Sequence, residues 1–310
     1  MLKFILKRVC WAVFTLFVII TATFFLLNAA PGDPIAAKCK QMPESARLIM
    51  EKKYGLDRPV YERYVIYMKN LLKGDLGTSI VYPGVQIKDI ITQKAPTSGK
   101  LGGIALVFQL IIGISLGLIA GLKKDKIPDY VIRVLVVLAI CIPGFVFMTL
   151  LQYFLGFKLK VLPAFGWGQP INYVLPVLVF VVTGIAGYTK YTRSSTISVL
   201  NEDYIVTAKA KGCNEGRTVR KHVLRNAMIP MVTIIPPAIA GIFSGAFITE
   251  ATFGIPGIGS YFIKAVSDND YTMILGLSTF FTALYLVSLI AVDILYGIVD
   301  PRIRIVKGAK

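Results

Sequence analysis

Histidine and cysteine, which recur in catalytic and metal sites, are scarce in this 310-residue chain. The only histidine, His222, stands among the basic residues Arg220, Lys221 and Arg225. One histidine is too few for a multi-histidine metal site and makes a Ser-His-Asp catalytic set improbable. We therefore interpret His222 as an exposed helix residue and expect that the chain is not an enzyme.

Two further patterns of site chemistry do not occur in the sequence. The four cysteines show no C-x-x-C spacing, so we expect neither a metal site nor a disulfide: Cys10, Cys39, Cys141 and Cys213. The nucleotide-binding pattern G-x-x-x-x-G-K-[ST] is also missing. The chain is therefore expected to bind no cofactor of its own.

The composition points to a membrane protein. The chain is 55% hydrophobic and 16% charged, with a mean hydropathy of +0.67. Its net charge of +17 comes from basic residues in the connections between apolar segments, a distribution typical of membrane proteins. No separate basic domain stands out, so we expect no nucleic-acid binding.

Six apolar segments approach or exceed the length of a membrane-spanning helix. In lipid, every backbone polar group must be satisfied within a helix or a closed barrel, and the alternating pattern of barrel strands is absent. The sequence thus predicts an all-α membrane protein with six transmembrane helices. They cover about residues 9–29, 101–122, 130–154, 174–188, 228–250 and 273–299.

Charge predicts the orientation of these helices. With the N-terminus inside, 19 of the 34 Lys and Arg residues fall on the inner side and three in the short outer loops. Both termini are then cytoplasmic. We expect a first segment and helix at 1–30, an extracytoplasmic loop at 31–98, and a core of five helices at 99–310 with a cytoplasmic loop at 190–229.

The extracytoplasmic loop is expected to be partly helical. Residues 44–54 suit a short helix ended by Gly55, and Pro59 suits the start of a second helix that stops at Gly74. The second helix gathers six residues on one face: Tyr61, Tyr64, Val65, Met68, Leu71 and Leu72. This face suits either a cap lying on the membrane or a docking surface for an extracytoplasmic partner.

Small residues and prolines mark where helices contact or bend. Glycine recurs every fourth residue at 113, 117 and 121, and again at 241 and 245, which predicts close helix packing. Pro143 and Gly144 are expected to break the third span near its middle, and prolines 230, 236 and 237 crowd the start of the fifth. Kinked packing and a translocation path are both compatible with these breaks.

Two acidic residues lie within apolar spans, where charge often has a function. Asp293 lies in the sixth span, and we expect it to pair with a nearby Arg or Lys and fix a helix. Glu250 ends the fifth span and could face the outer mouth of a path. We name Pro143, Ser244 and Glu250 as possible path residues.

The loop at 190–230 is long, polar and basic, with eight Lys or Arg residues, three acidic residues and the only histidine. Residues 198–211 are compatible with a helix that Gly212 would end. Asn214 could cap a second helix that contains Val219, Val223 and Leu224. A mere connector needs only a few residues, so a helix–turn–helix of this size suggests contact with a soluble partner.

Two stretches of this loop, EDYIVTAKAKG at 202–212 and HVLRNAMIP at 222–230, resemble the cytoplasmic loop of ATP-binding-cassette importer permeases. Of the general pattern E-A-A, three residues, G, nine residues, I-x-L-P, the chain keeps Ala208, Gly212 and Leu224. The likeness to the B-type permease of dipeptide and oligopeptide importers is stronger. It extends to APGDP at 30–34, YGLDRP at 54–59, GDLGTS at 74–79, FGIPGIG at 253–259, DY at 270–271 and DPR at 300–302, whereas PTSGKL at 96–101 departs from it.

The resemblance implies a type I ABC importer permease in a prokaryotic inner (cytoplasmic) membrane, in contact with lipid. It implies a heterodimer with a second homologous permease, two ATPase subunits that use ATP and Mg, an extracytoplasmic binding protein, and a peptide substrate. The residues it assigns to coupling with an ATPase are Asp203, Tyr204, Ala208, Lys209, Ala210, Lys211, Gly212 and Cys213.

Three alternatives remain on sequence grounds. Nickel and other small-solute importers share many of these motifs. A stand-alone secondary peptide carrier belongs to a different class, but the few charges within the spans and the large polar loop count against it. A membrane scaffold or receptor without transport is the third.

Overall fold

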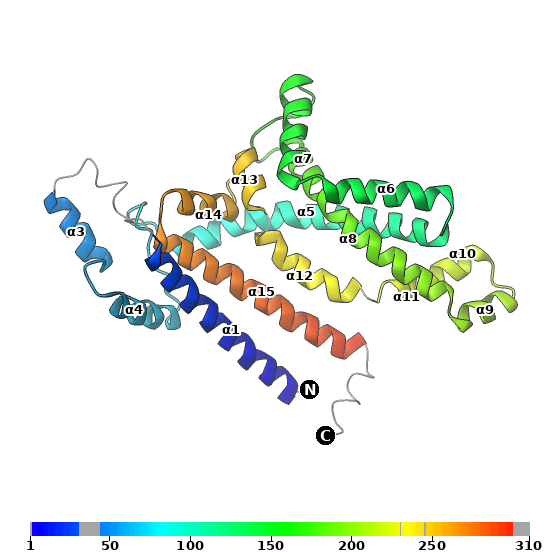
Figure 1. The fold of residues 1–310 in the computed structure, drawn as a ribbon, viewed down its shortest axis with the longest axis horizontal. Coiled ribbons are helices and arrows are strands. Elements are labelled where there is room, and N and C mark those ends of the chain that lie inside the picture. Colours follow the sequence, from blue (N-terminus) through cyan, green and yellow to red (C-terminus); the bar gives the residue numbers. More distant parts are fainter. Residues whose placement is uncertain (1, 31–43, 230, 245, 300–310) are drawn as a thin grey trace. The chain divides into compact units, whose positions relative to one another are not determined.

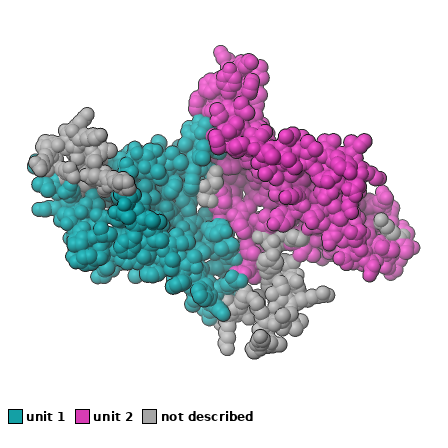
Figure 2. Space-filling model, in the orientation of Figure 1, with its two compact units in different colours: residues 1–99, 243–290 teal, residues 100–242, 291–310 magenta. Residues whose placement is uncertain are grey.

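The computed structural model describes residues 2–30, 44–229, 231–244 and 246–299. The described residues form helices and connections without a strand, and the one isolated bridge joins Thr78 and Gln86 (Figure 1). The described residues within 1–99 and 243–290 form one compact unit, and those within 100–242 and 291–310 form another (Figure 2). The all-α class is confirmed.

Within the described residues, five helices are long and apolar enough to cross a membrane, at Ile5–Ala29, Ile87–Leu122, Pro170–Leu200, Ile234–Phe253 and Tyr271–Leu295. They correspond to α1 (Leu2–Ala29), α5 (Ile87–Leu122), α8 (Val174–Leu200), α12 (Met231–Ser244) with α13 (Phe247–Phe253), and α15 (Tyr271–Val299). A sixth candidate is a bent pair of helices. Large apolar side chains such as Trp11 and Leu26 point outward from α1, as lipid-facing residues do.

The bent pair confirms the predicted break in the third span. Helix α6 (Ile127–Cys141) ends before Pro143, and α7 (Gly144–Leu151) continues into a π-helical turn, η1 (Gln152–Lys158). The two arms lie at 96° to one another. The cause is local, because a residue before proline is pushed out of the helical region, and Ile142 has an extended backbone with ψ 117°.

Helix α5 begins earlier than predicted. The second span was expected from about residue 101, but the helix starts at Ile87 and carries Pro96 inside it. Ile87 and Ile90 are buried in the core of the first unit, against Met273 and Leu277. Packing of this apolar face overrides the polar composition of residues 87–100.

The start of the polar loop also differs from the prediction. Helix α8 does not stop near residue 188 but continues to Leu200, so the single helix expected at 198–211 is wrong. The chain turns at Asn201, and a separate short helix, α9 (Asp203–Ala210), follows. Polar residues that favour turns and caps over helix interiors occupy this break.

The first unit contains both helices predicted for the extracytoplasmic loop. They are α3 (Glu44–Tyr54), followed by Gly55 with φ +66°, and α4 (Val60–Leu72), followed by Gly74 with φ +78°. From α4, the ring of Tyr64 packs against Phe24 of α1, and its hydroxyl lies 2.7 Å from the Thr21 hydroxyl.

The predicted apolar face of α4 is only partly covered. Tyr64 and Met68 are partly buried, whereas Tyr61 is 65% exposed and Leu72 is 85% exposed. The face thus remains available to lipid or a partner, and both interpretations of it stay predictions.

A short helix that the sequence did not predict completes the first unit. Helix α14 (Ile258–Ser267) begins after Gly257, and the Ser260 hydroxyl donates to the Gly257 carbonyl at 2.8 Å. Ile258 and Ala265 are fully buried in the same core as Ile87. The helix has ten residues and is too short to show as an apolar span.

In the second unit, the glycine spacing of α5 produces the predicted close packing. A methyl group at Gly117 would lie 2.6 Å from the Thr189 carbonyl oxygen and 2.6 Å from Cβ of Thr192, both on α8. Gly113 and Gly121 meet the same helix just as closely. For the second set, Gly241 has nothing within 4 Å of such a methyl group, and Gly245 lies outside the described residues.

The division predicted at residues 30 and 98 was based on the expected membrane topology, whereas the two compact units are defined by which residues pack together. Residues 243–290 pack with residues 1–99, and residues 100–242 form the body of the other unit. The division into segment, outer loop and core stays a prediction. The orientation of the termini stays a prediction as well, and the motif at 300–302 and most of that at 30–34 lie outside the described residues.

Candidate functional site

The polar loop presents a short helix whose surface is mostly exposed. Within α9, Ile205 is 1% exposed and Ala208 is 8% exposed, and these two residues anchor the helix. Tyr204 and Val206 of the same helix are exposed. The Thr207 hydroxyl donates to the Asp203 carbonyl at 3.0 Å, within the helix.

Gly212 ends this helix, as predicted. Its φ is +81°, and the Cys213 N–H donates to the Ala208 carbonyl at 3.1 Å, which is the bond pattern of a glycine C-cap. Nothing lies within 4 Å of the place where a side chain at Gly212 would begin. The glycine is therefore required by backbone conformation and not by crowding within this chain.

The second arm of the loop is capped by Asn214, again as predicted. Its side-chain oxygen accepts from the Arg217 N–H at 2.9 Å, at the start of α10 (Glu215–Thr218). A π-helical turn, η3 (Val219–Val223), and α11 (Leu224–Ala227) continue the arm. The predicted second helix is thus present in three short pieces.

One hydrogen bond ties the two arms together. The Asn226 amide donates to the Tyr204 hydroxyl at 3.0 Å and to the His222 carbonyl at 2.9 Å. Tyr204 belongs to the first resembling stretch and Asn226 to the second. His222 is partly buried, not exposed as expected.

The predicted coupling residues lie close together in sequence, on α9 and the turn that follows it. Asp203, Tyr204, Ala210, Lys211 and Gly212 are exposed. Cys213 is partly exposed, and Ala208 is buried. The side chain of Lys209 lies outside the described residues.

The three predicted path residues do not form one cluster in a single unit. Pro143 is exposed at the bend of the second unit, whereas Ser244 and Glu250 belong to the first. The side chain of Ser244 lies outside the described residues. The role of all three in a path stays a prediction.

Glu250 is fully buried within the first unit. Its Oε2 accepts from the N–H groups of Gly259 and Ser260 at 2.8 and 3.1 Å, at the beginning of α14. A side chain at Gly257 would overlap this carboxylate. Free N–H groups at a helix start favour a negative charge, so Glu250 stabilises the start of α14.

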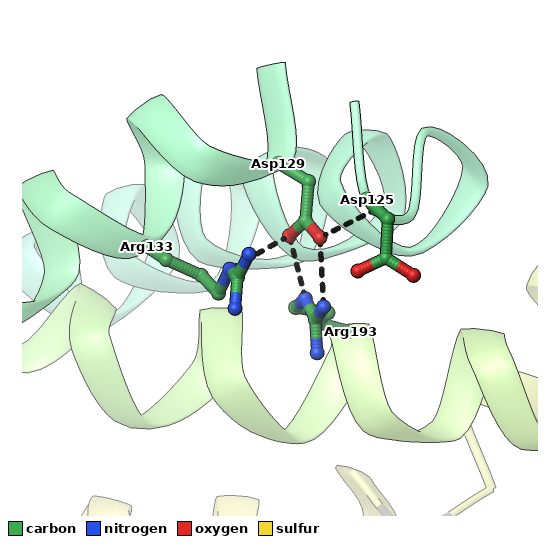
Figure 3. A network of polar contacts seen from close by, with 4 residues as sticks. All are labelled: Asp125, Asp129, Arg133 and Arg193. Atoms are coloured by element: carbon green, nitrogen blue, oxygen red, sulfur yellow. Dashed lines mark hydrogen bonds and ion pairs between the residues drawn. The ribbon is translucent and has the colours of Figure 1, made fainter. Parts of the chain in front are cut away.

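The sequence reasoning missed a buried ion pair in the second unit. Asp129, at the beginning of α6, is 0% exposed and accepts two hydrogen bonds from Arg193 of α8, from Nε and Nη2, each at 2.7 Å (Figure 3). The Arg133 Nε lies 3.5 Å from the same carboxylate, and the Asp125 N–H donates to it at 3.0 Å. Two parallel bonds from one guanidinium are the strongest form of such a pair.

A second buried aspartate, Asp270, was also missed, although its motif was noted. It accepts a short hydrogen bond from the Ser79 hydroxyl and further bonds from the N–H groups of Ile80 and Met273 at 3.2 and 3.0 Å. Burial, and to a lesser extent the Asp270 charge, raises the pKa of Tyr54. The structure thus joins the motif at 74–79 to the motif at 270–271.

These polar contacts suit positioning rather than reaction chemistry. Within the described residues, no group of three His, Cys, Asp or Glu side chains is placed to hold a metal ion. Asp293 has an interaction partner as well. No local sequence signal pointed to either Arg193 or Asp129.

Comparisons with known proteins agree over the whole length of the chain. Residues 113–305 match the family described as binding-protein-dependent transport system inner membrane component, and residues 1–82 match its N-terminal counterpart. The oligopeptide transport system permease protein OppB of Haemophilus influenzae is 39% identical over 98% of this chain and 100% of its own length. The dipeptide transport system permease protein DppB of Bacillus subtilis is 38% identical over 99% of both chains, and OppB of Escherichia coli is 36% identical over 98% of this chain and all of its own.

Proposed function

The chain belongs to the family of binding-protein-dependent transport system inner membrane components, and from this premise we propose that it is a pore-forming permease subunit of an ATP-driven importer of short peptides. The observation that carries the proposal is the full-length similarity to permeases of both oligopeptide and dipeptide systems. The protein is a multi-pass protein of the prokaryotic cell membrane, and its role is transport.

The proposal includes an assembly around this chain. A second, homologous permease forms the other half of the pore, and two ATPase subunits bind ATP and Mg on the cytoplasmic side. An extracytoplasmic binding protein delivers the peptide. The family's description as binding-protein-dependent supports the last partner and argues against a carrier that works alone.

Coupling to the ATPases is assigned to the loop at 198–229, with α9 as the helix that enters a groove on an ATPase. Support comes from the exposed surface of α9, its anchoring through Ile205 and Ala208, and the bond between Tyr204 and Asn226. A helix fixed at both ends transmits a displacement instead of absorbing it. Lys209 and Lys211 are assigned to pair with acidic groups of the ATPase.

The mechanism we propose is alternating access. ATP closes the two ATPases, the coupling helices move with them, and the pore opens outward to receive a peptide. Pro143, Ser244 and Glu250 are proposed as path residues. Substrate selectivity is assigned mainly to the binding protein, because a pore for many peptides needs only a broad, weakly polar lining.

The experiment that tests this proposal is reconstitution. The chain is co-expressed with its neighbouring transport genes, and the complex is placed in liposomes with ATP inside and short peptides outside with the binding protein. We expect peptide uptake that needs ATP and the binding protein, and peptide-stimulated ATP hydrolysis. Full-speed uptake by the purified chain alone would contradict the proposal.

A variant of Gly212 tests the coupling assignment within the same assay. Gly212→Leu places a side chain at φ +81°, which costs about 1–2 kcal/mol, and adds bulk to the surface proposed to face the ATPase. We expect normal expression and lost uptake. The control is Gly84→Leu, outside this loop, where φ is also +81° and nothing lies within 4 Å of the new side chain's first atom, so that it carries the same backbone strain. Normal uptake by Gly212→Leu would remove the assignment.

A further inference from the structure

A displacement of α9, the proposed coupling helix, would reach the rest of the chain through α8. This helix runs from Val174 to Leu200, and only Asn201 and Glu202 separate it from α9. A two-residue connection gives little slack between the two helices. What α8 is fastened to therefore decides which other parts of the molecule follow the coupling helix.

Toward α5, the attachment is made by backbone packing. A methyl group at Gly117 would lie 3.0 Å from the backbone N of Arg193, and one at Gly121 would lie 3.1 Å from its carbonyl oxygen. Gln109 of α5 adds a hydrogen bond from its side-chain amide to the Phe180 carbonyl at 2.6 Å. The backbone of Arg193 is thus held, and its side chain is free to bind a partner.

Toward α6, the attachment has an apolar part and a polar part. Ile132 and Val136 of α6 pack in one cluster with Ala186 of α8 and Ala120 of α5. Apolar contact is not directional, so it tolerates sliding. The two-bond contact of Arg193 with Asp129 fixes both distance and orientation.

Asp129 also holds the connection between α5 and α6. The Asp125 N–H that donates to it belongs to a residue with φ +59°, a conformation that is unfavourable for residues other than glycine. One buried carboxylate therefore binds the turn, α6 and α8 together (Figure 3). Arg133 is a lesser partner, since its side chain is 43% exposed and lies 3.5 Å away.

We propose that Asp129 and Arg193 form a positioning pair that makes α6 follow α8 when the coupling helix α9 moves. The movement driven by ATP hydrolysis in the ATPases then reaches the bend at Pro143. The inference rests on the proposed function and adds the route by which the movement leaves the polar loop. Neither residue contacts substrate or nucleotide in this role. They act by keeping two helices in one register.

A purely stabilising ion pair is the competing explanation, and a double variant separates the two. Removing Asp129 leaves the mostly buried charge of Arg193 unpaired, and removing Arg193 leaves Asp129 with only its weaker partners, so either single change damages folding under either explanation. Asp129→Asn with Arg193→Gln removes both charges and leaves neutral polar side chains, of which Asn matches Asp in shape and Gln is shorter than Arg. A stabilising pair is then dispensable, whereas a positioning pair is not.

The test uses the complete complex in liposomes and measures assembly, the melting temperature, ATP hydrolysis without peptide, and peptide transported per ATP hydrolysed. For the double variant we expect normal assembly, near-normal hydrolysis without peptide, and a loss of about tenfold in peptide transported per ATP. Arg133→Gln, which alters the exposed partner of the same carboxylate, is the matched control and should transport normally.

Arg193→Lys keeps the result interpretable if the double variant fails to assemble. It preserves both charges but cannot make two parallel bonds, so we expect assembly with peptide transported per ATP reduced several-fold. Wild-type transport per ATP in either variant overturns the positioning role. Absence of peptide-driven hydrolysis in the wild-type complex would instead overturn the proposed function, which keeps the two failures distinct.

Discussion

Asp129 and Asp270 are both fully buried aspartates, yet their partners differ in kind. Asp129 is bound chiefly by one charged side chain, Arg193, from a helix 64 residues away. Asp270 is bound by the Ser79 hydroxyl and by backbone N–H groups. The first carboxylate joins two helices, whereas the second holds an irregular segment of chain against the start of α15.

The difference predicts different consequences of losing each carboxylate. A buried arginine left without its partner keeps its charge, since its pKa is too high for it to become neutral. Backbone N–H groups left without a partner are neutral, and an irregular segment can turn them toward water. Loss of Asp129 should therefore disrupt the whole contact between α6 and α8, whereas loss of Asp270 should loosen only the irregular segment that it binds.

The largest effect is expected from Asp129→Ala. It removes the partner of a mostly buried guanidinium and should lower the free energy of unfolding by about 3–5 kcal/mol. The measurement is the denaturation midpoint of the purified complex in detergent. A loss below about 1 kcal/mol would mean that water already screens Arg193, and the contrast between the two aspartates would disappear.

A smaller effect is expected from Asp270→Ala. It removes the acceptor for the Ser79 hydroxyl and for the N–H groups of Ile80 and Met273, and should cost about 2–3 kcal/mol. Hydrogen exchange should rise in residues 77–85 and stay unchanged in α6 and α8. A rise spread evenly over the chain would contradict the local role of this carboxylate.

Gly117→Ala tests how closely α5 packs against the backbone of α8 near Arg193. The new methyl group meets the Thr189 carbonyl oxygen and Cβ of Thr192 at 2.6 Å, which should cost about 1–3 kcal/mol. Gly103→Ala on the same helix is the matched control, because nothing lies within 4 Å of its methyl group. The control should be neutral or stabilise by about 0.5–1 kcal/mol, and equal melting temperatures for the two variants would contradict the close packing.

The smallest effect is expected from Ser79→Ala. It removes one donor to Asp270 and leaves the backbone donors in place, so the loss should be about 1 kcal/mol. The denaturation midpoint of this variant, compared with that of Asp270→Ala, measures how much of the second site depends on its side-chain donor. A loss as large as that of Asp270→Ala would mean that the backbone bonds contribute little.

The sequence predicted the features that depend on neighbouring residues. Long apolar segments indicated the spans, the spacing of Gly113, Gly117 and Gly121 indicated the tight face of α5, and Gly212 indicated the end of α9. Each signal is local, because a helix face repeats within four residues and a left-handed turn favours glycine at a single position. The position of the candidate coupling helix α9 could be predicted in the same way, from the helix end at Gly212 and the polar residues around it.

What the sequence did not predict depends on partners far along the chain. Asp129 and Arg193 are separated by 64 residues, and Ser79 and Asp270 by 191. Helix α5 begins at Ile87 because that residue is buried against Met273, which overrides the polar residues around Pro96. Helix α14 is too short and mixed in composition to stand out from a loop.

The 96° bend between α6 and α7 also has a consequence for counting membrane crossings. If both arms together pass from one side of the bilayer to the other, the chain makes six crossings and its two ends share a compartment. If the bent pair enters and returns on the same face, the five remaining crossings place the ends in opposite compartments. The geometry at Ile142 and Pro143 thus decides whether the number of membrane crossings is even or odd. Compartment-sensitive reporters fused to the two ends would show directly whether the ends lie on the same side of the membrane.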